Sequence, residues 1–230
     1  MAVPEYVRCE HNSRVIIVEN SNSLESPTRR RGRPRAFDRD VALAAAGQTF
    51  WRLGYEGASI ADLTAAMGIT PQSLYAAFVS KADLYREALE RYRQEEGAAA
   101  GRSLNGEGHV VDVVAKLLRV SAHEFSVPGR PKGCMISTAV LTCAVENDVI
   151  ARHVTALRNQ TLSALETRLR RGIEEGELRG HTDAAGLARF IGAILQGMTV
   201  QAQDGAGEAD LLSIAEFASD EVARHRHPVV

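Results

Sequence analysis

The 230-residue chain contains little cysteine, only three lysines and no long apolar run. Three cysteines, Cys9, Cys134 and Cys143, are too few and too widely spaced for a disulfide framework, which indicates a reducing cytoplasm. No apolar run approaches the ~18 residues that a membrane span needs, so we expect neither secretion nor a membrane partner. The histidines show no metal-ligand spacing with the cysteines, so we expect no metal and no other cofactor.

Sequence motifs of the common enzyme classes are also missing. There is no glycine-rich phosphate loop, no Gly-x-Ser-x-Gly elbow and no His-Glu-x-x-His pair. The formal net charge of -2 gives no overall attraction to nucleic acid. The charge is uneven, however, because residues 29–35 contain five arginines. We therefore expect a binding protein rather than an enzyme, with its attraction for nucleic acid concentrated near the N-terminus.

The composition is that of a soluble globular protein, 45% hydrophobic and 24% charged. From Asp38 onward every segment has helical periodicity, with turns marked by glycine and proline, which predicts an all-α fold. We expect a disordered extension over residues 1–28 and a DNA-binding domain over 29–96. A larger helical domain for ligand binding and dimerisation is expected over 97–230. The boundary is placed in a weakly structured, glycine-rich joint at 97–108.

The N-terminal domain begins with a series of capped helices. Asp38 is a capping residue before a helix that ends at Gly54, and Ser59 opens a second helix. After a turn at Gly68, Pro71 occupies the first position of a third helix. Two short helices joined by a tight glycine turn are the arrangement that places a second helix in the major groove.

The third helix carries the residues expected to read DNA. Thr70 and Pro71 begin it, Gln72 can pair bidentately with adenine, and Ser73 can donate or accept a hydrogen bond. Other residues are of the types that hold phosphate groups: Tyr55, Ser59, Tyr75 and Lys81. The sequence thus predicts base contacts from this helix and phosphate contacts around it.

The basic segment just upstream contains Gly32 and Pro34, which keep it extended. Its arginines are Arg29, Arg30, Arg31, Arg33 and Arg35. An extended arginine arm fits the narrow minor groove of A·T-rich DNA, where the negative potential is strongest. Two alternatives stay open at this point. The run could be a solvated charged tract, or the protein could bind A·T-rich DNA without sequence specificity, as an architectural protein does.

The segment from Arg33 to about Leu89 resembles the TetR family of regulators. The residues that carry the resemblance are Ala45-Ala46, Phe50, Gly54-Tyr55, Ser59-Ile60, Leu63, Gly68-Ile69, Leu74-Tyr75, Phe78, Ser80-Lys81 and Leu84. The resemblance implies a three-helix head, a helical ligand-binding body and dimerisation through the last two helices. It also implies that Tyr75 and Lys81 hold phosphates and that Gln72 and Ser73 face base edges.

The same resemblance implies the partners and the location. These are a palindromic double-stranded DNA operator, a second copy of the chain and a small-molecule inducer that releases the operator, at the bacterial nucleoid in the cytoplasm. A repressor is expected, with an activator as the alternative. The doublet Ala76-Ala77 departs from the family, which often has a larger residue there.

Two features of the second domain suggest function. The apolar stripe on the penultimate helix predicts a symmetric dimer interface made of Leu187, Phe190, Ile191, Ile194, Leu195 and Met198. Cys134 is expected at the N-terminus of a helix over 134–145, where the dipole and Lys132 would favour a reactive, redox-sensing thiolate. The alternative is that Cys134 is a small apolar residue at a tight helix start. No ligand-binding residue is predicted.

Overall fold

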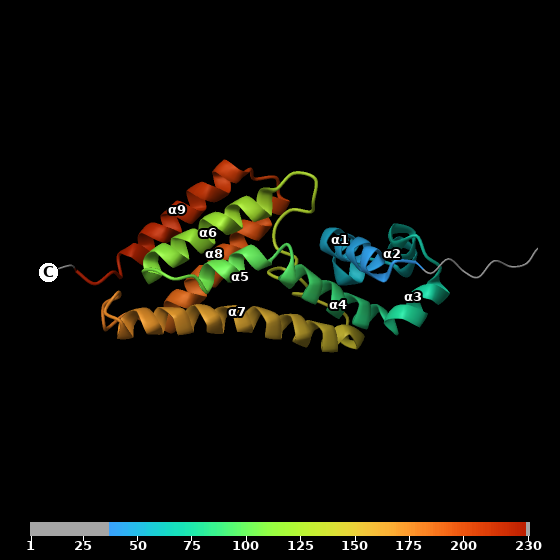
Figure 1. The fold of residues 1–230 in the computed structure, drawn as a ribbon, viewed down its shortest axis with the longest axis horizontal. Coiled ribbons are helices and arrows are strands. Elements are labelled where there is room, and N and C mark those ends of the chain that lie inside the picture. The colour runs from blue at the N-terminus through green and yellow to red at the C-terminus, as the bar shows by residue number, and fades with distance from the viewer. Residues whose placement is uncertain (1–36, 229–230) are drawn as a thin grey trace, which may run out of the picture. The chain divides into compact units, whose positions relative to one another are not determined.

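The computed structural model describes residues 37–228, and this part of the chain is all-α as predicted (Figure 1). It contains nine α-helices and one 3-10 turn, and its only β feature is an isolated bridge between Leu178 and Arg226. No helix within 37–228 is both long enough and apolar enough to cross a membrane. The predictions for residues 1–28 and for the arginine arm lie outside the described residues.

Four helices form the N-terminal head. They are α1 (Arg39–Gly57), α2 (Ile60–Met67), α3 (Pro71–Phe78) and α4 (Lys81–Gln94). Asp38 caps α1 by accepting from the amides of Asp40 and Val41, which confirms the predicted start. Gly54 (φ 72°) interrupts the helical backbone near the end of α1, where the sequence predicted the stop.

The head has a core rich in aromatic side chains. The rings of Phe50 and Tyr85 meet edge to face with centroids 4.8 Å apart, and those of Trp51 and Tyr92 do so at 4.9 Å. Leu63, Leu74 and other aliphatic side chains fill the spaces between these rings. Because rings in this geometry attract one another as well as burying area, they fix the angles between α1 and α4.

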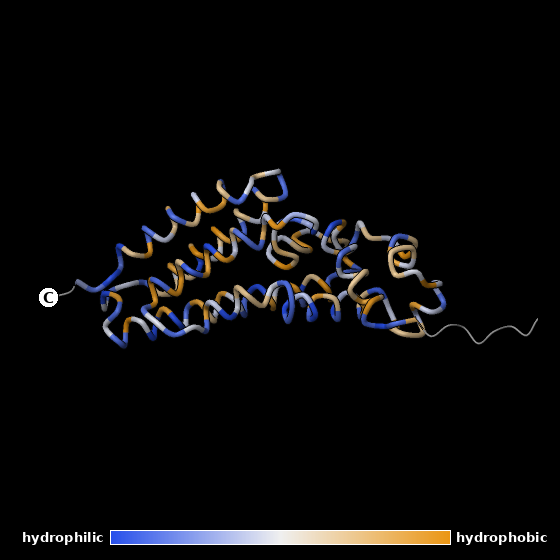
Figure 2. The backbone as a smooth tube through the Cα atoms, turned by 45° about the horizontal axis from the view of Figure 1, so that its top comes forward, coloured by the Kyte–Doolittle hydropathy of each residue, from blue (hydrophilic) through white to orange (hydrophobic). Residues whose placement is uncertain are grey.

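The C-terminal body contains five helices and one 3-10 turn. They are α5 (Ala98–Leu104), α6 (Val110–Ser126), η1 (Val145–Asn147), α7 (Asp148–Glu174), α8 (Ala184–Gln203) and α9 (Glu208–Ala223). Helix α6 packs against both α8 and α9 (Figure 1). Apolar residues recur at helical spacing along these elements, in orange in Figure 2. Their core is aliphatic, with Phe125 as its one buried aromatic member.

Helix α7 belongs to both cores. Its first half places Ile150, Val154 and Leu157 in the head core, and its second half places Leu165 and Leu169 in the body core. These residues recur at intervals of three, four and eight, so they share one face of α7. The first half of this face is buried in the head core and the second half in the body core. The head therefore draws part of its core from a segment far along the chain.

Two expectations about the body are wrong. The segment 97–108 is not a weakly structured joint, because residues 98–104 form α5, which buries Leu104 against the body core. A run of alanines favours a helix strongly enough to tolerate the central Gly101.

Residues 134–145 do not form the predicted helix. Other groups satisfy the backbone there: the amide of Cys134 donates to Thr199 Oγ1 at 3.3 Å, and Arg158 donates to the carbonyl of Ala139 at 2.7 Å. Val140 has a φ of 49°, which no α-helix allows. Side chains from α7 and α8 thus replace the helical hydrogen bonds of this segment, and this tertiary pairing could not be read from its periodicity.

Candidate nucleic-acid interface

The start of α3 is fixed by local hydrogen bonds. Gly68 adopts the left-handed conformation (φ 66°) that ends α2, and Thr70 then caps α3 by accepting from the amide of Ser73 at 3.2 Å. Pro71 follows at the first helical position, where a missing N–H costs nothing. The two helices are therefore held in the short, tightly turned arrangement that the sequence predicted.

One face of α3 is exposed and polar, and the other is buried. Gln72, Tyr75 and Ala76 are exposed, with Tyr75 48% accessible, whereas Leu74 and Phe78 lie in the head core. Residues at spacings of three and four share a helix face, so the exposed set forms one continuous surface. This surface carries an amide and a phenol, groups that bond to bases and phosphates.

The other predicted contact residues of this turn are engaged within the head. The Ser73 hydroxyl is half-buried and lies 3.0 Å from the hydroxyl of Thr70. Ser59 caps α2 by accepting from the amide of Asp62, and its hydroxyl donates to the Asp62 carboxylate at 2.6 Å. This Ser59 bond is the main reason that the pKa of Asp62 is lowered. These hydroxyls hold helix ends in place, and their contacts to DNA stay predictions.

Lys81 and Tyr55 form a pair beside α3. The Lys81 ammonium lies 4.7 Å from the centre of the Tyr55 ring, within cation–π range. Burial raises the pKa of Tyr55, and burial also lowers the pKa of Lys81, which nearby Glu56 opposes. The Tyr55 ring is buried in the head core, where it supports the ammonium, and the contacts of Lys81 and Tyr55 with phosphate stay predictions.

Arg39, which was not predicted as a site residue, connects α1 with α3 and α4. Its guanidinium donates to both carboxylate oxygens of Glu87 on α4, at 2.9 and 2.7 Å. It also lies 4.4 Å from the ring of Phe78 at the end of α3. Because Glu87 is 48 residues away, no local pattern in the sequence could reveal this contact.

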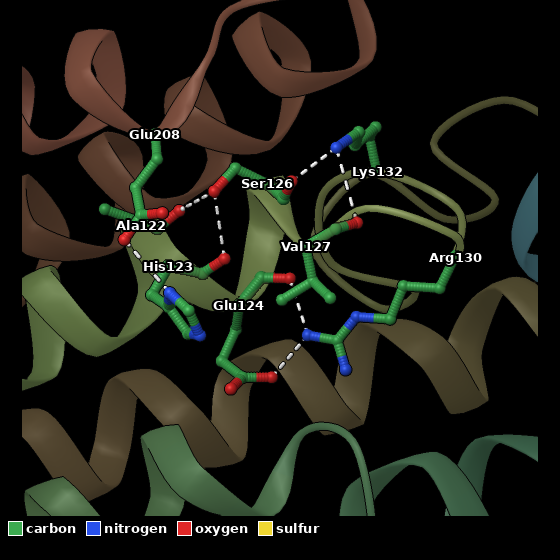
Figure 3. Close-up of polar contacts among 8 residues, drawn as sticks. All are labelled: Ala122, His123, Glu124, Ser126, Val127, Arg130, Lys132 and Glu208. Carbon is green, nitrogen blue, oxygen red and sulfur yellow. Dashed lines mark hydrogen bonds and ion pairs between the residues drawn. The ribbon is translucent and has the colours of Figure 1, made fainter.

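The body contains a cavity of about 330 Å³, bordered by α4, α5, α6, α7 and α8. Cys134 is half-buried at its wall, and its sulfur accepts from the amide of Ile136 at 3.4 Å. Because residues 134–145 are not helical, the helix-dipole argument for a reactive Cys134 is wrong. Lys132 does not support it either, since its ammonium donates to the carbonyls of Ser126 and Val127 (Figure 3).

The predicted dimer stripe on α8 is mostly core of the protomer itself. Leu187, Ile191, Leu195 and Met198 are each at most 9% exposed and pack among α6 and α9. These four side chains are therefore not available to a partner, and the prediction is wrong for them. The physical reason is that α6 and α9 of the same protomer already cover this side of α8. Phe190 is 36% exposed and Ile194 is half-buried, so these two members remain accessible.

A capped helical head with an exposed polar third helix, joined to a helical body that borders a cavity, defines a helix-turn-helix DNA-binding regulator. Comparisons with known proteins identify the family. Residues 42–88 match the model of bacterial regulatory proteins of the tetR family, and residues 111–206 match a tetracyclin repressor-like C-terminal domain. The chain therefore belongs to the TetR family, and it is a DNA-binding transcriptional regulator rather than an enzyme.

Several characterised proteins are similar over most of the chain. The transcriptional repressor ComR of Escherichia coli is 33% identical over 85% of this chain and 93% of its own. The repressor BdcR of Escherichia coli is 29% identical over 83% of this chain and 92% of its own. The structure of a cysteine mutant of the regulator CifR, in complex with 26-base-pair operator DNA, is 42% identical over 82% of this chain and 98% of that one, with a TM-score of 0.78.

Proposed function

We propose that the protein is a homodimeric repressor that binds a palindromic operator and is released from it by a small molecule bound in the body. The observation that carries the proposal is the exposed polar face of α3, with Gln72 and Tyr75 on one surface beside Lys81. The relatives ComR and BdcR are named repressors, and CifR has been solved on operator DNA. These similarities support the same activity for this chain.

In this proposal the DNA contacts fall into two kinds. Gln72 reads a base edge in the major groove, which contributes specificity. Tyr75 and Lys81 hold phosphates, which contribute affinity for any sequence and a dependence on salt. The arginines of residues 29–35 enter the neighbouring minor groove and add to both affinity and salt dependence.

The exposed apolar side chains of the last two helices are proposed to meet those of a second copy. On α8 these are Phe190 and Val200, which are 36% and 45% exposed, and on α9 Phe217 is 77% exposed. Large apolar side chains left in water on two adjacent helices are typical of an isologous interface. Two-fold symmetry would then place two copies of α3 about 34–36 Å apart, one turn of DNA.

The cavity is the proposed site of the releasing ligand. Tyr92 on α4 and Gly97, just before α5, border it, and Tyr92 also packs on Trp51 in the head. A molecule that enters the cavity therefore contacts α4, the last helix of the head. A second candidate signal is modification of Cys134, because its thiol lies at the same wall.

Selection of bound sequences from a random duplex pool, at two salt concentrations, tests the DNA-binding proposal. The expected result is a palindrome with half-sites about one helical turn apart. Enrichment of A·T-rich DNA alone, lost at the higher salt concentration, would establish the architectural alternative instead. A reporter gene placed behind the selected site should be transcribed less when the protein is present, whereas higher transcription would identify an activator.

Three variants separate the proposed roles. Gln72→Ala should relax base preference at one position of the half-site, by a factor of about 5–100. Lys81→Ala should weaken binding to specific and random DNA alike and reduce the salt slope by about 0.9 per protomer. Asn159→Ala, which removes an exposed amide from α7 outside the head, is the matched control and should change neither. Equal losses on specific and random DNA for Gln72→Ala would contradict its assignment.

A further inference from the structure

Within the described part of the body, two buried hydroxyls, those of Ser121 and Thr182, have no hydrogen-bond partner, and Ser121 is the one on a helix. Ser121 on α6 is 1% exposed, and its Oγ contacts no acceptor or donor in the protein. Ser126, five residues later on the same helix, is also buried but donates to the carbonyl of Ala122 at 2.9 Å. Thr199 on α8 likewise donates to the carbonyl of Leu195 at 3.0 Å. Unlike the hydroxyls of Ser126 and Thr199, that of Ser121 does not donate to the carbonyl four residues earlier in its helix.

Ser121 lies at the wall of the cavity. An unpaired hydroxyl in an apolar surrounding costs free energy, which a bound group that supplies a partner would recover. The surface of the cavity is more apolar than polar, and its larger apolar side chains are Leu104, Leu117, Phe125, Ile136, Leu157, Leu162 and Leu195. Uncharged polar side chains also line it, among them Asn105, Ser137, Gln160 and Gln196. A cavity with a mostly apolar surface and a few polar groups, one of them an unpaired buried hydroxyl, has the composition of a small-molecule site.

The charged side chains of the lining leave no net charge for a ligand to neutralise. They comprise two arginines and two glutamates: Arg93, Glu96, Glu124 and Arg158. The Glu124 carboxylate is paired with the guanidinium of Arg130 (Figure 3). The Arg158 guanidinium donates to the carbonyl of Ala139 and to the hydroxyl of Thr155. Since an unpaired charge is costly to bury, the pairing of Glu124 and the hydrogen bonds of Arg158, together with the balance of charge, favour an uncharged ligand.

The close approach of α7 and α8 shapes the same wall. A Cβ added at Gly192, which borders the cavity, would clash with a methyl carbon of Leu162. By contrast, a Cβ added at Gly101 on α5 would meet nothing within 4 Å. Space therefore remains on the α5 side, whereas the α7–α8 side is closely packed.

We infer that the cavity takes a neutral, largely apolar molecule that places one hydrogen-bond-accepting oxygen against the hydroxyl of Ser121. This inference rests on the proposed function, because it gives the chemical class of the releasing ligand. A volume of about 330 Å³ accommodates a compact ring system or a short chain. Discrimination comes from Ser121, because an analogue without the oxygen leaves that buried hydroxyl unpaired.

Three naphthalenes of matched shape test the inference on the full chain without DNA. They are 2-acetylnaphthalene, which carries a carbonyl oxygen, 2-isopropylnaphthalene, which lacks it, and 2-naphthoate, which is charged. Titration calorimetry should show the ketone binding most tightly. Ser121→Ala should weaken the ketone by about 5–10-fold, the usual value of one neutral hydrogen bond, and leave the hydrocarbon within about twofold.

Two further variants locate the effect. Ser126→Ala removes a hydroxyl from the same helix, but one that already has its partner and lies away from the cavity, so it should not change the preference for the ketone. Gly101→Leu, which extends a side chain into open space at the cavity, should weaken all neutral probes. Circular dichroism of each variant checks that the helical fold is retained.

The inference is overturned if 2-naphthoate binds most tightly, if Ser121→Ala leaves the ketone unchanged, or if neither neutral naphthalene binds. Operator binding by the same protein sample is measured separately. A protein that binds its operator but rejects the ketone contradicts the ligand class alone. A protein that binds the ketone through Ser121 but no specific DNA contradicts the proposed repressor and leaves the ligand class standing.

Discussion

The two cores of the molecule are built from different side chains. The head core contains six aromatic residues, Phe50, Trp51, Tyr55, Phe78, Tyr85 and Tyr92, and the body core contains one, Phe125. The head is a small set of short helices, and large rings give a small domain more buried area for each residue that it orders. The body has longer helices that bury enough leucine, valine and alanine without rings.

This difference corresponds to what each part has to do. Rings in edge-to-face contact, such as Phe50 on Tyr85 at 4.8 Å, fix α1 against α4, and the short helix α3 packs on α4. The core of the body is aliphatic, and a cavity of about 330 Å³ lies between its helices and the end of α4. The two parts of the molecule thus differ both in the side chains of their cores and in the presence of a cavity.

The largest expected effect comes from removing a ring of the head core. Phe50→Ala should lower the free energy of unfolding by about 3–5 kcal/mol, because Phe50 is 1% exposed and contacts two other rings. Denaturant unfolding followed by the fluorescence of Trp51, the single tryptophan, measures this change. Leu118→Ala, at a fully buried body position, should cost about 2–5 kcal/mol but retain more operator binding at low denaturant. Equal loss of operator binding would contradict the distinction between the cores.

The next effect concerns Gly133, in the loop that follows α6 and packs against Thr199 of α8. Gly133 has a φ of 74°, and a Cβ added there would lie 2.7 Å from the Thr199 methyl carbon. Gly133→Ala should cost about 2–5 kcal/mol, the sum of a left-handed penalty and overpacking. Gly129→Ala is the matched control, since Gly129 has a φ of 81° with nothing within 4 Å, and it should cost about 1–2 kcal/mol. If both variants melt at the same temperature in a thermal scan, the contact with Thr199 is unimportant.

A smaller effect is expected at the caps of the head. Ser59→Ala removes the hydroxyl that accepts from the amide of Asp62, and should cost about 1 kcal/mol. Ser163→Ala, at an exposed position on α7 of the body, should change stability by less than about 0.5 kcal/mol. Urea titrations of the two variants compare them directly, and similar midpoints would show that α2 is held by its core alone.

The smallest effect depends on pH and involves Glu56. This exposed carboxylate accepts from the side chain of Asn147 at 2.8 Å and from the amide of Ala144 at 2.7 Å. These bonds, that of Asn147 first, lower its pKa below the ordinary value of 4.5. A lowered folded-state pKa stabilises the protein above about pH 4.5 and loses that contribution as the pH falls through the folded value.

Melting temperatures recorded from neutral pH down to about pH 3 test this contact. The wild type should lose slightly more stability on acidification than Glu56→Gln, whose amide does not titrate. Parallel curves for the two proteins would show that the bonds between Glu56 and the η1 segment contribute nothing to stability.

The sequence predicted the head better than the body, for physical reasons. Asp38, Ser59 and Ser80 are capping residues whose hydrogen bonds run to amides two or three positions away, so a local pattern suffices to place helix starts. The same holds for Pro71 at the first position of α3. These elements follow from short-range chemistry that no tertiary contact overrides.

Features that depend on distant contacts could not be predicted. The segment 134–145 has apolar spacing compatible with a helix, but Arg158 and Thr199 take its backbone groups from two other helices. The stripe on α8 revealed that Leu187 and Ile191 are apolar but not that α6 and α9 cover them within one protomer. The cavity and the unpaired hydroxyl of Ser121 likewise exist only once five helices are assembled.

The double burial of α7 has a consequence for how the chain unfolds. A fragment that ends at Glu96 would lack Ile150, Val154 and Leu157, and would expose to water the aromatic surface that they cover. We therefore expect that the head does not fold alone, although it carries the proposed DNA-reading surface. Because one continuous helix closes both cores, opening either core strains the other, and the amide protons of α7 should exchange with solvent only through global unfolding.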